Sequence, residues 1–212
     1  MNQLKFGSLG EAWIYLTRQT LEQGEPMGEE GYELLTAAAT FPVPTGADPL
    51  VDRFGEQRML AEMEKVFFSE GPNSLGHSYL RLMRGPRNRS DLLDVVELLR
   101  VEPATKRAVV TLCGEGNGKI PCLNIVQFLN RGGKLNAIYF ARGQDVYKKF
   151  YADALCVARM AREVAGQLAL PAGFISAIIG SCHLYHQDVP AVRNMLETIS
   201  VSPNLSAVVG AP

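Results

Sequence analysis

Two apolar segments separated by a glycine turn place the strongest constraint on how this 212-residue chain folds. Residues 122–128 and 135–142 each have the length and apolar content of a buried strand, and Arg131-Gly-Gly-Lys134 lies between them. Adjacent glycines supply the positive φ angles that a tight hairpin turn requires. We therefore expect an antiparallel hairpin that brings Cys122, at the start of one strand, within reach of Arg142 on the other.

The rest of the chain mixes helical and extended patterns around this hairpin. Apolar periodicity and end signals predict helices over residues 9–23, 57–68, 92–99 and 152–168, the third with an N-cap at Ser90-Asp91. Strands are predicted over 108–113 and 174–184, and the Pro, Thr and Gly content of residues 40–49 predicts a loop. The pattern indicates an α+β fold with a largely hairpin-built sheet, in a single domain spanning residues 1–212.

The net charge and the hydropathy of the chain argue against nucleic acids and membranes as binding partners. Net charge is −1 with 47% hydrophobic and 20% charged residues, which argues against a nucleic-acid or anionic-membrane partner. The chain contains no apolar run of about 20 residues that could span a bilayer, and its start lacks the basic and apolar regions of a signal peptide. We expect a cytoplasmic protein that binds no membrane. Four arginines lie close together in the sequence: Arg81, Arg84, Arg87 and Arg89. We interpret them as a solvated surface and not as a polynucleotide-binding site. One of them could still contact a phosphate.

The four cysteines form no CxxC pair and no zinc-ligand spacing with histidine, so we expect free thiols and no metal. Cys113, Cys156 and Cys182 fit small core residues. Cys122 differs because it follows Pro121 just after a glycine-rich loop, where a side chain can face a cleft. A thiol attacks as its thiolate, which a neighbouring guanidinium such as that of Arg142 stabilises.

The spacing that follows Cys122 resembles the thymidylate synthase family. The matching residues run without a gap through Gln127-Phe128, Arg142, Asp145, and His183-Leu-Tyr185. In this family a cysteine attacks C6 of a pyrimidine nucleotide, so that C5 accepts a carbon from methylenetetrahydrofolate. The resemblance implies a mixed sheet packed with helices, and a homodimer whose active sites share residues.

The resemblance also implies a role for each matching residue. Cys122 is the expected nucleophile, Arg142 binds the substrate phosphate, and Asp145 lies on the folate side. The pair His183 and Tyr185 holds the sugar hydroxyl. The segment containing Lys106 and Arg107 looks like the basic segment that reaches the phosphate bound in the other subunit, although two surface charges would look the same. Glu62 is the candidate catalytic glutamate, with Glu64 as the alternative.

Asp153 departs from the family pattern in a chemically specific way. Thymidylate synthases have an Asn there that reads the pyrimidine edge, whereas deoxycytidylate hydroxymethylases, a branch of the family, have Asp. A carboxylate accepts from the amino group of cytosine and, when ionised, donates nothing to O4 of uracil. Asp153 could equally cap the helix that follows it.

Further departures concern the pocket that the resemblance implies. The family has a Trp covering the transferred carbon, whereas the only Trp here is Trp13, and the comparable region is Glu62-Met-Glu-Lys-Val-Phe-Phe68. Without that cover water can attack, which favours a hydroxymethyl product, although a Phe could substitute. Gly143 replaces a Ser beside the phosphate arginine, so CMP joins dCMP as a candidate substrate. Leu123 and Ser181 replace a His and an Asp.

These residues predict a hydroxymethyltransferase acting at C5 of CMP or dCMP, with Cys122, Glu62 and Asp153 as catalytic residues. Its predicted substrate-binding residues are Lys106, Arg107, Arg142, Gly143, Asp153, His183 and Tyr185. One alternative is a shortened thymidylate synthase that methylates dUMP. The other is a nucleotide-binding homologue without catalysis, which the lost His, Ser and Asp positions motivate.

Overall fold

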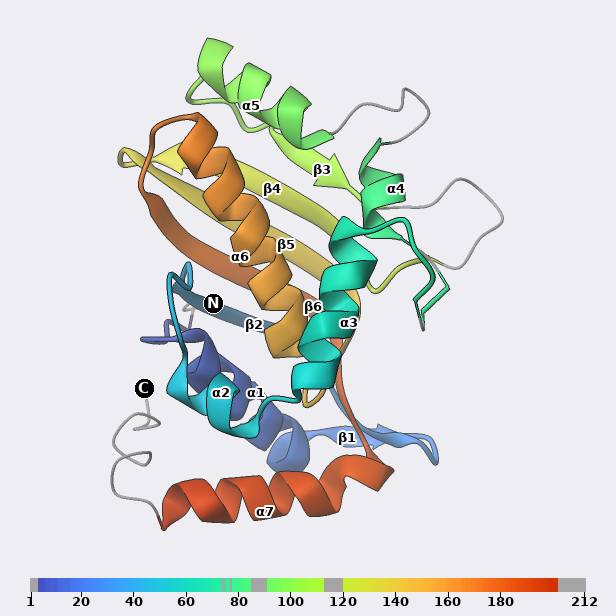
Figure 1. Ribbon diagram of the computed structural model, residues 1–212. Coiled ribbons are helices and arrows are strands. Elements are labelled where there is room, and N and C mark those ends of the chain that lie inside the picture. Colours follow the sequence, from blue (N-terminus) through green and yellow to red (C-terminus); the bar gives the residue numbers. More distant parts are fainter. Residues whose placement is uncertain (1–3, 74, 77, 85–90, 113–119, 202–212) are drawn as a thin grey trace.

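The computed structural model describes residues 4–73, 75–76, 78–84, 91–112 and 120–201. Their strands form one six-stranded sheet in the order β1-β2-β6-β5-β4-β3 (Figure 1). The strands are β1 (Glu25–Met27), β2 (Gly31–Pro42), β3 (Val109–Thr111), β4 (Leu123–Arg131), β5 (Lys134–Asp145) and β6 (Ala172–Tyr185). All neighbours pair antiparallel except β5 and β6, which are parallel. The expected α+β fold is confirmed.

Seven α-helices in the described residues accompany this sheet. They are α1 (Leu9–Gln23), α2 (Pro49–Phe54), α3 (Gln57–Phe68), α4 (Tyr79–Arg84), α5 (Asp91–Val101), α6 (Phe150–Gln167) and α7 (Val189–Ser200), with a 3-10 turn η1 (His186–Asp188) before α7. Helix α6 crosses the middle of one sheet face, and α1 and α3 lie on the same side (Figure 1). The crossover from β5 to β6 through α6 gives the parallel pair.

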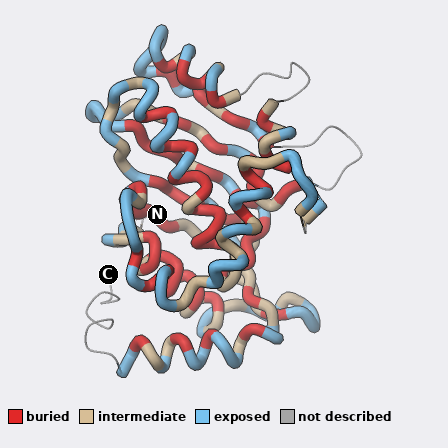
Figure 2. Tube along the Cα trace, viewed as in Figure 1, coloured by how far each residue is buried: buried red, intermediate tan, exposed pale blue. Residues whose placement is uncertain are grey.

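The buried core lies between these helices and the sheet (Figure 2). Helix α6 supplies twelve buried residues, many of them Ala, so its backbone can approach β5 and β6 closely. Trp13 of α1 is fully buried, with its ring 4.4 Å from that of Tyr151 and its Nε1 donating to the Tyr147 carbonyl at 3.0 Å. These contacts fix α1 against the start of α6.

The hairpin predicted from the glycine pair is confirmed. Gly132 and Gly133 have φ angles of 60° and 71°, and Arg131 pairs with Lys134 across the turn. At the other end of the two strands, the Arg142 amide donates to the Cys122 carbonyl at 2.9 Å. The turn therefore sets the register that holds Arg142 beside Cys122.

Helix predictions for α1, α3, α5 and α6 are confirmed within two residues, although Ser90 lies outside the described residues. The loop predicted for residues 40–49 is partly wrong, because β2 runs to Pro42 and Asp48 caps α2 by accepting from Leu50 and Val51 amides. No prediction covered β1, β2, α2, α4 or α7. Asp153 does not cap a helix: α6 begins at Phe150, so Asp153 lies inside its first turn.

The sheet face opposite α6 carries exposed apolar side chains in register. Ile125, Phe140 and Ile178 lie in one row across β4, β5 and β6, because Ile125 pairs with Phe140 and Phe140 with Ile178. Each is 38–41% exposed. Among the described residues, no helix is long and apolar enough to cross a membrane.

Candidate active site

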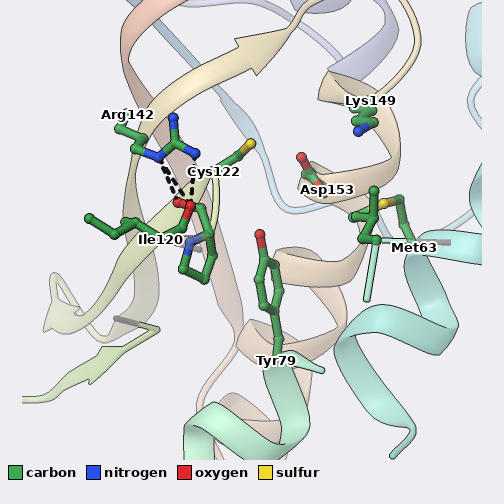
Figure 3. Close-up of a pocket in the computed structure, with 9 residues that line it drawn as sticks. Met63, Tyr79, Ile120, Cys122, Arg142, Lys149 and Asp153 are labelled. Carbon is green, nitrogen blue, oxygen red and sulfur yellow. Dashed lines mark hydrogen bonds between the residues drawn. The ribbon is translucent and has the colours of Figure 1, made fainter. Parts of the chain in front are cut away.

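A pocket of about 350 Å³ opens where β4 begins, β5 ends and α6 starts (Figure 3). Three residues predicted for the active site line it: Cys122, Arg142 and Asp153. In Figure 3 the Cys122 sulfur and the Asp153 carboxylate turn toward the same space, with the Tyr79 hydroxyl below them. The remaining lining residues are Met63, Leu75, Tyr79, Ile120, Pro121 and Lys149.

Cys122 is the partly exposed thiol of the three described cysteines, while Cys156 and Cys182 are buried as expected. Cys113 lies outside the described residues. Asn124 fixes the approach to Cys122: its Nδ2 donates to the Pro121 carbonyl at 2.9 Å, and its Oδ1 accepts from the Arg142 amide at 3.2 Å. The pairing of β4 with β5 shifts register at this point, as at a bulge that turns a side chain toward a cleft.

Arg142 is anchored to the segment that precedes the thiol. Its Nε donates to the Pro121 carbonyl at 3.1 Å, and its Nη2 donates to the Ile120 carbonyl at 2.7 Å. No hydrogen bond donated by Arg142 Nη1 is found among the described residues. The guanidinium is therefore placed beside Cys122 and keeps a donor that can meet an anionic ligand.

Asp153 is a buried carboxylate on the wall opposite Cys122. It is 3% exposed, and its Oδ2 accepts from Gln144 Nε2 at 2.8 Å. Burial raises the pKa of Asp153 to about 6, against the opposing effects of the Gln144 hydrogen bond and the Lys149 ammonium. Asp153 is therefore mainly ionised at neutral pH, but close to the point of protonation.

The strand ends beside the pocket carry the other predicted binding residues. Asp145 is 8% exposed and accepts from the Lys148 amide at 3.0 Å, and burial raises the pKa of its carboxyl. The backbones of Asp145 and His183 pair, and the rings of His183 and Tyr185 lie 5.2 Å apart. A Cβ at Gly143 would lie 3.7 Å from His183 Cε1, so packing does not require glycine there.

The structure leaves both candidate glutamates outside the pocket lining. Glu62 is half-buried beside Met63 on α3, and Met63 is the residue of that turn that lines the pocket. Glu64 is exposed and forms an ion pair with Arg159 at 2.6 Å.

Lys106 and Arg107 lie far from Cys122 of their own chain. The Lys106 carbonyl accepts from Gln127 Nε2, and the neighbouring Thr105 carbonyl accepts from Arg131 Nη2 at 3.3 Å, so this segment lies beside the second half of β4. At ~3.3 Å per strand residue, the segment is about 20 Å from Cys122. Arg107 is exposed and paired with Glu102 at 2.7 Å. In one chain the two cations do not join the pocket.

Sequence reasoning missed most of the other lining side chains, among them Met63, Tyr79 and Lys149. Lys149 precedes Asp153 by four residues, and that spacing on a helix was a usable signal. Tyr79 had none, because it opens a six-residue helix that no periodicity marks. Its hydroxyl accepts from the Leu123 amide at 3.4 Å, burial raises its pKa, and its ring packs edge-on against Phe67 at 4.6 Å.

The described residues contain no group of three or more His, Cys, Asp or Glu side chains placed to share a metal ion. A thiol, a guanidinium and a buried carboxylate surround a space of nucleotide-base size.

Comparison with known proteins agrees with this chemistry. The model of the thymidylate synthase family matches residues 57–208, which is most of the chain. A protein named "Putative thymidylate synthase" from Methanosarcina barkeri is 24% identical over 164 residues, covering 72% of this chain and 76% of that protein. A protein of the same name from Methanothermobacter marburgensis is 19% identical over 92% of this chain and 98% of its own length. The thymidylate synthase of Listeria monocytogenes is 23% identical, but the match covers only half of this chain and 35% of that enzyme.

Proposed function

Because this chain belongs to the thymidylate synthase family, and is thereby a one-carbon transferase, we propose that it hydroxymethylates C5 of a cytidine nucleotide, CMP or dCMP. The observation that carries the choice of base is Asp153, a buried carboxylate facing Cys122 across the pocket. An ionised carboxylate accepts from the amino group at C4 of cytosine and repels O4 of uracil.

Cys122 begins the reaction. Its sulfur forms a bond to C6, and the electrons of the C5–C6 double bond make C5 nucleophilic. Arg142, beside the sulfur, anchors the phosphate through its remaining donor, with Lys106 and Arg107 supplied by a second subunit. His183 and Tyr185 hold the sugar, and Gly143 leaves room near His183 for a ribose hydroxyl.

Methylenetetrahydrofolate supplies the carbon as a co-substrate. Asp145 is the proposed folate-side residue, since a carboxylate can accept from pterin N–H groups. After C5 has taken the carbon and lost its proton, tetrahydrofolate departs and leaves an exocyclic methylene on the pyrimidine. Water adds to this methylene, and the C6–sulfur bond breaks to restore the ring and free Cys122. Glu62, next to Met63, is the proposed organiser of that water.

Tritium release tests this proposal. CMP, dCMP, UMP and dUMP carrying tritium at C5 are each incubated with the protein and methylenetetrahydrofolate. We expect release from the cytosine nucleotides and none from a Cys122→Ala variant. Release confined to uracil nucleotides would contradict the choice of base, and turnover by Cys122→Ala would contradict the nucleophile.

One observation favours a second candidate, a thymidylate synthase that methylates dUMP. The pocket does hold an aromatic ring, that of Tyr79, supported by Phe67 of α3. A ring there can shield the methylene from water, as the family's Trp does. Formation of dihydrofolate would identify this reaction, because only the reductive route oxidises the folate.

A further inference from the structure

Gln144 contacts the proposed base-reading residue from behind the pocket. It is 1% exposed on β5, and its Nε2 donates to Asp153 Oδ2 at 2.8 Å. Gln144 does not line the pocket, whereas Asp153 does. No role in the reaction described above uses this amide.

The hydrogen bond decides which carboxylate oxygen is available. Gln144 occupies Oδ2, while Asp153 Oδ1 is buried without a hydrogen-bond partner among the described residues. An ionised carboxylate offers only acceptors, so the amide must present its nitrogen to it. The pair therefore offers a ligand one fixed acceptor, and a buried acceptor without a donor is costly until a ligand supplies one.

We propose that Gln144 is a positioning residue that sets base preference: it holds Asp153 so that Oδ1 accepts from the C4 amino group of a cytidine nucleotide. This inference rests on the proposed function and adds a residue to it. Cytosine brings the donor that Oδ1 lacks. Uracil brings the acceptor O4, which would face Oδ1 without a proton between them.

The charged and titratable groups around Asp153 agree with this role. Asp153 interacts electrostatically with Tyr79 of α4, with Tyr139 and Asp145 of β5, with Lys149 just before α6, and with Cys156 of α6. Of these, Lys149 favours the ionised carboxylate and Asp145 opposes it. Gln144 is the residue that stabilises the ionised form by a direct hydrogen bond. Its loss is therefore expected to make Asp153 easier to protonate.

Equilibrium binding of CMP and UMP without folate, measured across pH, tests the inference. We expect the wild-type protein to bind CMP more tightly than UMP near neutral pH, and to lose that preference as Asp153 takes up a proton. Gln144→Met keeps the side-chain length and removes the donor. It should lower the CMP-to-UMP preference by ~10-fold, the effect expected for a charged hydrogen bond. It should also move the midpoint of the pH dependence to higher pH.

Two further variants complete the design. Gln144→Glu places an acceptor where the donor was, and should change preference and midpoint in the same direction even if Gln144→Met folds poorly. Asn136→Leu is the matched control: Asn136 is also buried on β5 and hydrogen-bonded, but at the far end of the strand. It should lower stability while leaving preference and midpoint unchanged.

The outcomes separate this inference from the proposed function. A wild-type protein without preference for cytosine overturns both. A wild-type preference for CMP that persists in Gln144→Met and Gln144→Glu, with the midpoint unmoved, overturns the role of Gln144 alone.

Discussion

The proposed function requires Asp153 to be charged, whereas a buried charge lowers the stability of the folded protein. Asp153 is only 3% exposed, yet burial raises its pKa no further than about 6, so the site holds a charge at neutral pH. Holding a charge in a buried position destabilises the folded state unless partners compensate. Gln144 donates a hydrogen bond to Oδ2 of Asp153, whereas Oδ1 has no donor among the described residues and is proposed to accept from the ligand.

Replacing Asp153 by Asn is predicted to stabilise the protein while damaging its cytosine preference. The folded-state pKa lies above the unfolded value of 3.8, so proton binding by Asp153 stabilises the fold fully below pH 3.8. That contribution is lost as the pH rises through about 6. Asn does not titrate, so the variant should gain on the order of 1–3 kcal/mol over wild type at about pH 7.5 and little at about pH 4.

Urea denaturation at the two pH values, combined with the CMP-to-UMP binding ratio, measures both effects. An equal stability difference at both pH values would show that Asp153 titrates alike in the folded and unfolded states. That result would remove the basis for treating it as a strained functional carboxylate.

At the scale of elements, the β4–β5 hairpin does the work of bringing Cys122 and Arg142 together. Its register follows from the turn, and the turn follows from Gly132 and Gly133, whose φ angles are positive. A side chain at such an angle costs about 1–2 kcal/mol. The geometry of the nucleophile is therefore encoded partly at the opposite end of the two strands.

Gly133→Ala is predicted to lower the free energy of unfolding by about 1–2 kcal/mol. Gly46→Ala is the matched control, because a Cβ there meets no atom within 4 Å and the φ angle is ordinary. That change should stay within about 0.5 kcal/mol of wild type. Denaturation midpoints of the two variants compare them directly, and equal midpoints would contradict the importance of the turn.

The sequence predicted this hairpin and the helices α1, α3, α5 and α6 because glycine turns and apolar periodicity are local signals. Strand β2 was not predicted because it pairs with β6, whose residues lie 132 to 154 positions further along the chain, and because the composition of residues 40–42 indicated a loop. The site residues likewise fall into those that a local signal predicts and those that only tertiary packing brings to the pocket. Cys122 and Arg142 share a hairpin, whereas Tyr79 reaches the pocket only through tertiary packing of α4.

At the scale of the molecule, the described chain keeps Lys106 and Arg107 apart from the pocket and leaves an apolar row on one sheet face partly exposed. Lys106 and Arg107 lie about 20 Å along the sheet from Cys122, beyond the reach of any side chain. The row Ile125, Phe140 and Ile178 faces away from the helices. A homodimer packed through these sheet faces, as the family implies, would cover the row and could bring each basic pair to the partner's pocket.

Mixing two inactive variants tests this arrangement. Cys122→Ala and Arg107→Ala each remove one contribution, and Arg107 is exposed, so its loss should cost little stability. If Arg107 acts on the partner's site, mixed dimers regain one intact site, and an equal mixture should recover about a quarter of wild-type tritium release. Recovery no greater than that of Arg107→Ala alone would place Arg107 outside the shared site.

The proposed function requires that water, and not hydride, completes the one-carbon transfer to cytosine. Product analysis by mass spectrometry after incubation with CMP and methylenetetrahydrofolate in water enriched in heavy oxygen measures this most directly. We expect a cytidine nucleotide heavier by one CH₂O unit that carries the heavy oxygen, together with tetrahydrofolate. A nucleotide heavier by only one CH₂ unit and formed together with dihydrofolate, or no new product from CMP, would overturn the proposed function.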